Sequence, residues 1–318
     1  MTTFLKYVSI FMAIERMIII IFDAGQFFQV MVIANPLSDT VFKWLMADNR
    51  IARFFIQTLL EETVTEVEVK PQELVYDKEG NSIMAASFAI FRLDYVATIK
   101  LATGEYKKVL IEIQKARNIT DIMRFRNYLG KHYMKEDEVI IDGLTTTSIL
   151  PIVTIYLLGF KLPEIDTPAV KVSRQYINQI NHQVITQKNE FIEKLTHDSY
   201  IVQIPRIDGK IQTSLEQVLS FFEQKYYIDD TGMLKEYPYP IVDEDMKLIA
   251  DALHYAGLDP IKRRMIETEN EAYRVYLATT KELQEKLDFE QKARLAAEKT
   301  VQEMLNELAE LKRKLGTT

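Results

Sequence analysis

The sequence predicts an α/β protein whose central mixed sheet is flanked by helices and followed by a helical region and a C-terminal coiled-coil helix. Helical apolar stripes alternate with short β-branched runs, and the last of these runs is apolar throughout, as buried strands are. The segment from Ile261 to Leu315 lacks Gly and Pro and is rich in Glu, Lys and Arg. We expect four parts: an apolar extension (1–34), an α/β core (35–160), a mixed, mainly helical part (161–260) and a long helix (261–318).

Composition limits the classes of function. The 318 residues are 47% hydrophobic and 27% charged, which is typical of a globular chain. A net charge of −7 argues against a broad basic surface, so any site for a polyanion must be local. The absence of cysteine excludes disulfides, thiolate catalysis and cysteine-based zinc sites, and it fits a reducing cytoplasm. The four histidines have no metal-ligand spacing.

The N-terminal run from Val8 to Ala34 is rich in Ile, Phe and Met. Its longest uncharged apolar stretch, Met17 to Phe22, is too short to cross a bilayer. Charged residues interrupt the rest of the run: Glu15, Arg16 and Asp23. We therefore expect no stable membrane insertion, and we interpret Met31 as the natural start, with residues 1–30 as translated upstream sequence.

The core is predicted from Asn35 onward. An apolar stripe from Val41 to Leu60 indicates one long helix or two short ones, which Ser38 or Asp39 can cap. The following elements are, in order, a strand (63–69), a hairpin (88–101 and 107–116), a helix (121–134) and a buried strand (149–160).

Signals weaken after Pro163. Helices are predicted over 175–195, 214–226 and 243–256, with a strand over 200–207. In the last segment, a heptad started at Tyr273 places mostly apolar residues at a and d, interrupted by Thr280, Glu290 and Arg294. This pattern predicts a homo-oligomeric coiled coil; the alternative is a single solvated helix folding back on the body.

Two carboxylates stand out on the predicted hairpin. Alternation places Glu112 with Leu110 and Gln114 on one strand face, and a three-residue loop, 102–104, would set Asp94 directly opposite Glu112. Opposed carboxylates repel, but Mg²⁺ or Mn²⁺ between them would make a binding site. A two-residue loop would instead put Glu112 on the opposite face of the sheet from Asp94. The pair could also be a salt-bridged surface pair with Arg92 and Lys115 as partners.

A basic island surrounds these carboxylates. Residues 92–135 contain ten bases and four acids, which gives +6, so the remainder of the chain carries −13. Such an island suits metal-assisted attack on a phosphodiester, with the bases holding flanking phosphates. On the following helix, Arg124, Tyr128 and His132 share one face and could point to the same site.

An ordered set of motifs resembles a known family. The motifs are Asn35–Lys43, Arg92-Leu93-Asp94, Ile111-Glu112-Ile113-Gln114, Arg124 with Tyr128, and Pro151–Tyr156. Together they resemble the PD-(D/E)XK nuclease family transposases, which are related to the recombination-promoting nucleases. The resemblance covers about residues 35–160.

The resemblance implies a restriction-endonuclease-like core that cuts DNA with Mg²⁺. It implies that Asp94 and Glu112 are metal ligands and that Gln114 takes the place of a lysine, where its amide would orient water or substrate. Arg124, Tyr128 and Lys115 would contact the substrate. Asp39 matches the family's amino-terminal Asp-x-x-Phe-Lys signature, although it could serve only as a helix cap. The competing hypothesis is a catalytically silent descendant that binds DNA or assembles through its coiled coil.

Overall fold

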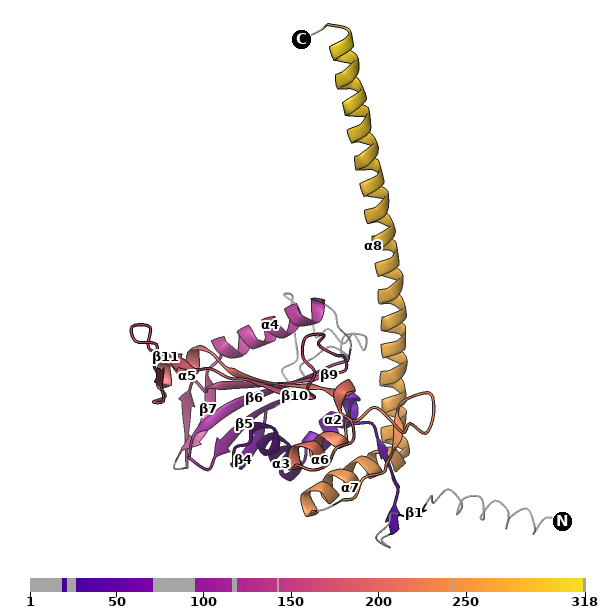
Figure 1. Cartoon of the computed structure of the whole chain (residues 1–318). Helices are drawn as coiled ribbons and strands as arrows, with labels where there is room; N and C mark the ends of the chain where they lie inside the picture. The colour runs from indigo at the N-terminus through magenta and orange to yellow at the C-terminus, as the bar shows by residue number, and fades with distance from the viewer. Residues whose placement is uncertain are drawn as a thin grey trace, which may run out of the picture. The chain divides into compact units, whose positions relative to one another are not determined.

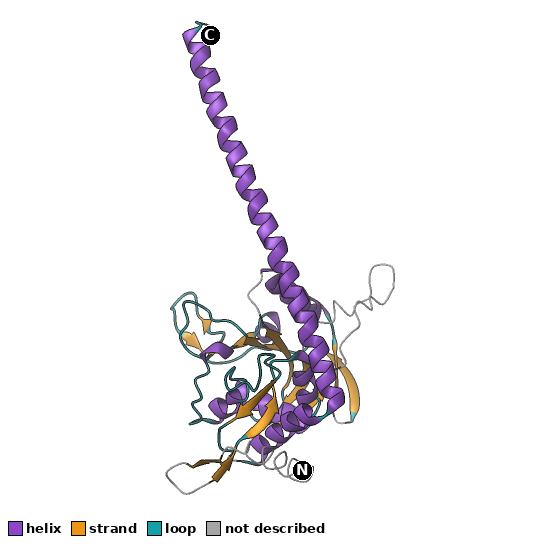
Figure 2. Cartoon of the chain, turned by 90° about the vertical axis from the view of Figure 1, so that its right-hand side faces the viewer, coloured by secondary structure: helices purple, strands orange, loops and turns teal. Residues whose placement is uncertain are grey.

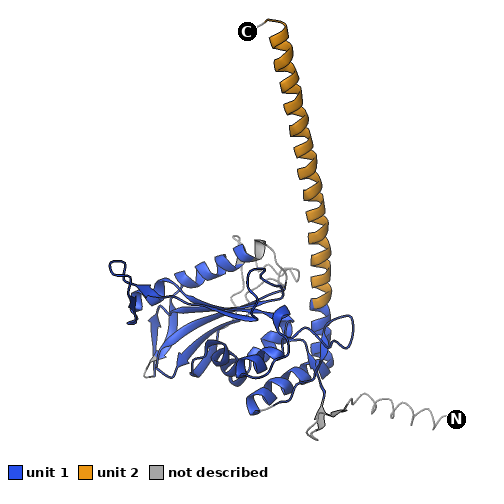
Figure 3. Cartoon of the chain, viewed as in Figure 1, with its two compact units in different colours: residues 1–269 blue, residues 270–318 orange. Residues whose placement is uncertain are grey.

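The computed structural model describes residues 19–21, 27–70, 95–115, 119–141, 143–241 and 243–316 (Figure 1). The chain divides into two compact units, residues 1–269 and 270–318 (Figure 3). The first contains the sheets and their helices, and the second is the continuation of one long helix. Asp94 and Arg92, together with most of the apolar N-terminal run, lie outside the described residues.

A six-stranded mixed sheet is the centre of the first unit, which confirms the α/β class. Its strand order is β10-β13-β9-β6-β5-β4. Strands β4, β5 and β6 pair antiparallel, β6, β9 and β13 pair parallel, and β10 closes the edge antiparallel to β13. The strands span Val64–Val69 (β4), Tyr95–Leu101 (β5), Tyr106–Gln114 (β6), Ile152–Leu158 (β9), Ala169–Val172 (β10) and Asp198–Gln203 (β13).

Helices cover both faces of this sheet (Figure 1). One face packs on the main core, whose centre is an aromatic cluster of Phe42, Phe55 and Phe222 with ring centroids 5.7–6.3 Å apart. The helices on this side are α2 (Asp39–Met46), α3 (Asn49–Leu60), α6 (Ser214–Ser220) and α7 (Glu244–Leu258). On the other face, α4 (Ile119–Met134) covers a smaller cluster around Leu110 and Phe125. Strand β6 therefore has two buried faces.

The hairpin between β5 and β6 has a three-residue loop, the first of the two alternatives that the sequence left open. The Leu101 amide donates to the Glu105 carbonyl over 2.8 Å, and Gly104 takes a positive φ of 88°, which favours glycine. Opposed residue numbers in the two strands sum to 206, as Tyr95 opposite Ile111 shows. The predicted register is thus confirmed over its described part, from Tyr95 to Leu101.

Several boundaries differ from the sequence prediction. The N-terminal stripe forms two short helices, one of the two predicted alternatives, because Asp48 caps a new helix by accepting from the Arg50 and Ile51 amides. The helix expected over 175–195 is wrong except for α5 (Glu190–Leu195). Its first part forms a small hairpin of β11 (Tyr176–Ile177) and β12 (Val184–Ile185). Asn178 accepts from the Ile180 amide in the turn, a local bond that competes with helix formation.

Packing extends beyond both expected ends of the core. Strands β10 and β13 come from after residue 160 yet complete the central sheet. Before Asn35, β3 (Met31–Ala34) pairs with β14 (Leu234–Tyr237), and Ile33 is fully buried. Two further ladders are small: β1 (Ile19–Ile21) with β2 (Phe27–Gln29), and β7 (Asp137–Ile141) with β8 (Leu144–Ser148). A 3₁₀ turn, η2 (Ile204–Arg206), follows β13.

The second unit is a single helix. Helix α8 runs from Pro260 to Lys314, and Figure 2 shows it as one unbroken helix. In the described part of the chain, the structure contains no helix long and apolar enough to span a bilayer.

A buried ion pair ties the β7–β8 hairpin to the sheet. Lys108 Nζ lies 2.6 Å from Asp137 Oδ1, and both side chains are at most 9% exposed. We expect Asp137→Ala to cost about 3–5 kcal/mol of unfolding free energy in urea denaturation, because it leaves Lys108 buried without this partner. The double variant Lys108→Met/Asp137→Leu should stay near wild type, since apolar residues of similar volume need no partner. A loss below about 1 kcal/mol for Asp137→Ala would contradict the prediction.

Candidate functional site

Glu112 is a buried carboxylate near the carboxyl end of β6. It is 3% exposed and faces α4, since it alternates with the core residues Ile111 and Ile113. Its neighbour across the parallel pair is Tyr156 of β9. Burial raises the pKa of Tyr156, and the negative charge of Glu112 adds to this rise. The predicted placement of Glu112 on the face of Leu110 is therefore what the structure shows.

Gln114 ends the same strand two residues later and shares that face. It is half-buried, and its backbone carbonyl accepts from the Gly159 amide over 2.8 Å. A Cβ on Gly159 would meet the Lys115 carbonyl oxygen at 2.6 Å, so only glycine fits without displacing the end of β6. Gly159 thus sets how closely the chain after β9 passes the candidate site.

Lys115 does not project to open solvent as a phosphate-binding lysine would. Its Nζ lies 2.6 Å from Glu269 Oε1 in α8. The same carboxylate accepts from Ser38 Oγ, the Asp39 amide and the Thr40 amide over 2.6–2.9 Å. Glu269 therefore caps α2 in place of Ser38, whose side chain makes no capping bond within its own helix.

The surroundings of Glu269 hold it ionised. Burial alone would raise its pKa, but Lys115 and the hydrogen bonds from Ser38 and Thr40 outweigh that effect and lower the pKa to about 2. Sequence reasoning missed this residue. One more glutamate in a helix rich in Glu and Lys carries no signal of a bond to residues 154 and 231 positions away.

Asp39, the residue of the amino-terminal signature, is the first residue of α2. Its Oδ2 pairs with Lys43 at 2.7 Å, and its Oδ1 is buried with no hydrogen-bond partner among the described residues. Asn35, the first residue of the motif Asn35–Lys43, bonds the Gln224 side chain and the Gly232 carbonyl. In the structure, then, this segment holds the first unit together.

The α4 residues expected to line the site have mixed roles. Tyr128 is half-buried against the cluster around Leu110, and its ring stacks on His132 with centroids 6.5 Å apart. Arg124 lies in the same helix, but its side chain is outside the described residues. Arg126 and Lys131 are exposed, and Lys131 Nζ lies 5.8 Å from the Tyr128 ring centroid.

Carboxylates from outside the basic island neutralise part of it. Among the described residues, four of its bases form ion pairs 2.6–3.2 Å long with acids outside residues 92–135: Lys100 with Glu66, Lys107 with Glu62, Lys108 with Asp137, and Lys115 with Glu269. These pairs offset four of the six excess positive charges. The exposed basic residues of α4 are consequently the main cationic surface that the structure describes near the site.

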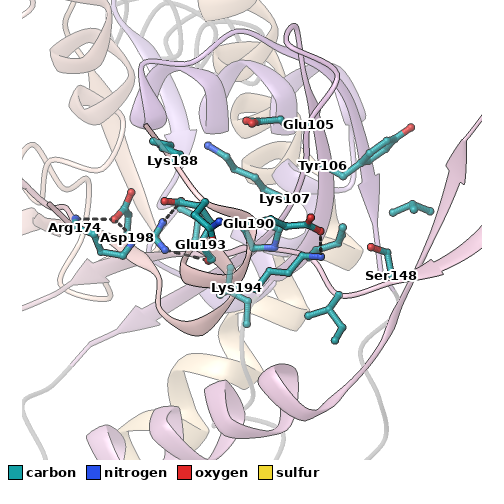
Figure 4. A pocket seen from close by; sticks show the side chains of 17 residues that line it. Glu105, Tyr106, Lys107, Ser148, Arg174, Lys188, Glu190, Glu193, Lys194 and Asp198 are labelled. Carbon is teal, nitrogen blue, oxygen red and sulfur yellow. Dashed lines mark hydrogen bonds and ion pairs between the residues drawn. The ribbon is translucent and has the colours of Figure 1, made fainter. Parts of the chain in front are cut away.

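A cavity of about 350 Å³ lies at the opposite end of the parallel strands (Figure 4). Residues that begin three strands line it, among them Lys107 of β6, Ile152 of β9 and Asp198 of β13. Arg174 bonds Asp198 and Glu193 across its wall at 3.0 and 2.7 Å. The described residues that line it include neither Glu112 nor Gln114, so it is separate from the candidate site.

The described residues supply only part of a metal-ligand set. Glu112 and Gln114 offer the oxygen donors that Mg²⁺ prefers, two positions apart on one strand face. Within the described ranges, no three His, Cys, Asp or Glu side chains gather as a metal site would require. Asp94, the expected second carboxylate, lies outside those ranges.

Comparison with models of protein families, with curated proteins and with solved structures found no match to this chain.

The contacts of Glu269 predict a pH-dependent stability. A pKa held at about 2 against the ordinary 4.5 corresponds to about 3 kcal/mol, present above pH 4.5 and lost as the pH falls toward 2. We expect Glu269→Gln to lower the unfolding free energy by up to this amount at pH 7, and the gap to wild type to close below pH 3. Urea denaturation at several pH values measures it.

Glu267→Gln, an exposed position on the same helix, is the matched control and should stay within about 0.5 kcal/mol of wild type. A gap for Glu269→Gln that stays constant from pH 7 to pH 3 would show that its carboxylate charge is not what stabilises the fold.

Proposed function

We propose that this chain is a Mg²⁺-dependent DNA endonuclease of the transposase or recombination-promoting nuclease type, with a restriction-endonuclease-like core. The observation that carries the proposal is the buried Glu112, which shares one face of β6 with Gln114 because side chains alternate along the strand. The order helix, antiparallel strands, helix and parallel strand supports the same core.

The burial of Glu112 supports a role as a cation ligand, beside the contact that it already makes within the chain. A carboxylate that is 3% exposed and beside Tyr156 is expensive to keep ionised unless a cation or hydrogen bonds compensate it. Glu112 is thus a group suited to ligating a cation, on a strand face that it shares with Lys108, Leu110 and Gln114.

Each residue would have a defined task in phosphodiester hydrolysis. Bound Mg²⁺ would supply charge neutralisation at the phosphate and a more acidic water. Glu112 would hold the cation with Asp94, and the Gln114 amide would orient water or substrate by hydrogen bonds. Arg124 and the exposed bases of α4 would contact flanking phosphates, whereas Lys115 would do so only after leaving Glu269.

The test of the site is cleavage of supercoiled plasmid with Mg²⁺. We expect Glu112→Gln, nearly the same shape without the charge, to lower the nicking rate about 100-fold or more, and Asp94→Ala to do the same. Glu105→Gln, on the exposed hairpin turn, is the matched control and should keep the wild-type rate. Equal nicking by wild type and both site variants would remove the assigned site. DNA binding without nicking by the wild type would instead support a silent DNA-binding or assembly protein.

The exposed bases of α4 predict how DNA binding depends on salt. Each phosphate contact contributes a slope of about −0.9 in a plot of log affinity against log salt. Replacing Arg126 and Lys131 by alanine should therefore weaken binding to any duplex and reduce the slope by about 2, as titrations at several salt concentrations would show. Lys292→Ala, an exposed base of α8, should leave the slope unchanged. An unaltered slope in the α4 variant would place the DNA surface elsewhere.

A further inference from the structure

The second unit carries an uncovered apolar stripe. Beyond Asn270, α8 continues without a break, and the leucine, valine and methionine residues at its predicted a and d positions are 48–77% exposed: Leu283, Leu287, Val301, Met304, Leu308, Leu311 and Leu315. A stripe of this length at heptad spacing is the seam of a coiled coil. Two charged residues at a and d positions of this stripe determine in which orientation a partner helix can cover it.

Glu290 occupies a d position and Arg294 the following a position. In a parallel, in-register dimer each would face its own copy, glutamate against glutamate and arginine against arginine. The like charges within each of these two layers would repel each other in the middle of a buried seam. In the single chain, Arg294 bonds Glu298 over 2.8 Å on the helix surface, a pair of small energetic value.

We propose that residues 273–315 form an antiparallel coiled coil with a second copy of this chain, in the register where opposed residue numbers sum to 584. Arg294 then faces the partner's Glu290, and by symmetry Glu290 faces the partner's Arg294. The two layers of like charges in the parallel dimer are thus replaced by two layers of opposite charges at the centre of the antiparallel dimer.

The same register pairs the rest of the seam. Apart from Arg294, all residues at heptad position a between Tyr273 and Leu308 face an apolar residue at position d of the partner. The least apolar of them, Thr280, faces Met304. The layers are Tyr273 with Leu311, Leu308 with Tyr276, Thr280 with Met304, Val301 with Leu283, and Leu287 with Ala297.

The flanking positions give independent support. Among the e positions from 277 to 312, only 277 and 305 hold apolar residues, both leucines that are at least 40% exposed. In an antiparallel coiled coil, the e positions of one helix lie beside the e positions of the other. The proposed register then sets Leu277 within two residues of the partner's Leu305 along the axis. In a parallel dimer these leucines would meet Ala272 and Thr300 instead. The parallel form gains one exposed pair, Glu307 with the partner's Lys312, which is worth little.

The proposal fixes where the two helices begin. Asn270 of one copy lies opposite Lys314 of the other, 44 residues away, so the starts of the two helices are about 65 Å apart along the rod. The two globular units would therefore be joined to opposite ends of it. This inference does not rest on the proposed nuclease activity.

Cysteine crosslinking of the full chain tests orientation and register together. The natural sequence has no cysteine, so introduced thiols are the only ones present. Under mild oxidation, a mixture of Leu283→Cys and Val301→Cys should give mixed disulfides, while either variant alone should give none, because position 283 is about 27 Å from its own copy. A mixture of Leu283→Cys and Leu308→Cys is the out-of-register control. Self-disulfides of Leu283→Cys, or no crosslink in the mixture, would overturn the proposal.

Charge exchange provides a second test by analytical ultracentrifugation. Glu290→Arg or Arg294→Glu alone should weaken the dimer on the order of 100-fold, because each sets like charges against each other in a buried layer. The double variant Glu290→Arg/Arg294→Glu should restore it. A parallel dimer would gain no restoration from the exchange, and a monomeric wild type at micromolar concentration would also refute the proposal.

Discussion

The ionised carboxylate of Glu269 is the interaction on which the arrangement of the first unit depends. It joins three segments far apart in the sequence: the amino end of α2, the residue after β6 and the start of α8. Without it, the first amides of α2 would lose their acceptor and Lys115 would lose its counterion. Because burial opposes ionisation, the low pKa of Glu269 shows that the surrounding donors more than compensate for the lost solvation. The end of the candidate strand is thus held from the α2 side of the sheet.

The other side of the sheet was largely predictable because local rules decide it. Alternation placed Glu112 with Leu110, whereas the sequence left a two-residue and a three-residue hairpin loop open, and the structure has three residues with Gly104 at a positive φ. Each of these features follows from residues within about ten positions of one another. The same is true of the division between α2 and α3, where Asp48 satisfies the first amides of the second helix.

Features set by distant contacts could not be predicted. Strand β13 reads as an ordinary short strand, and only its parallel pairing with β9 makes it part of the central sheet. The segment after Gln175 has helix-compatible residues, but Asn178 satisfies a backbone amide locally and the chain turns back. The Lys115 assignment fell short for the same reason, since its partner Glu269 lies 154 residues away.

Folding brings acidic residues from distant parts of the sequence next to the basic island. The sequence separates a basic island from an acidic remainder, and folding brings Glu62, Glu66, Asp137 and Glu269 back onto the island. The ion pair of Lys108 is buried and that of Lys115 is mostly buried, so salt screens them less than it screens pairs at the surface. A polyanion would therefore meet α4, where Arg126 and Lys131 are exposed, before it could compete for Lys115. Any phosphate that reached Lys115 would have to displace an acceptor that also caps α2, so occupancy of that lysine would loosen the helix end it now stabilises.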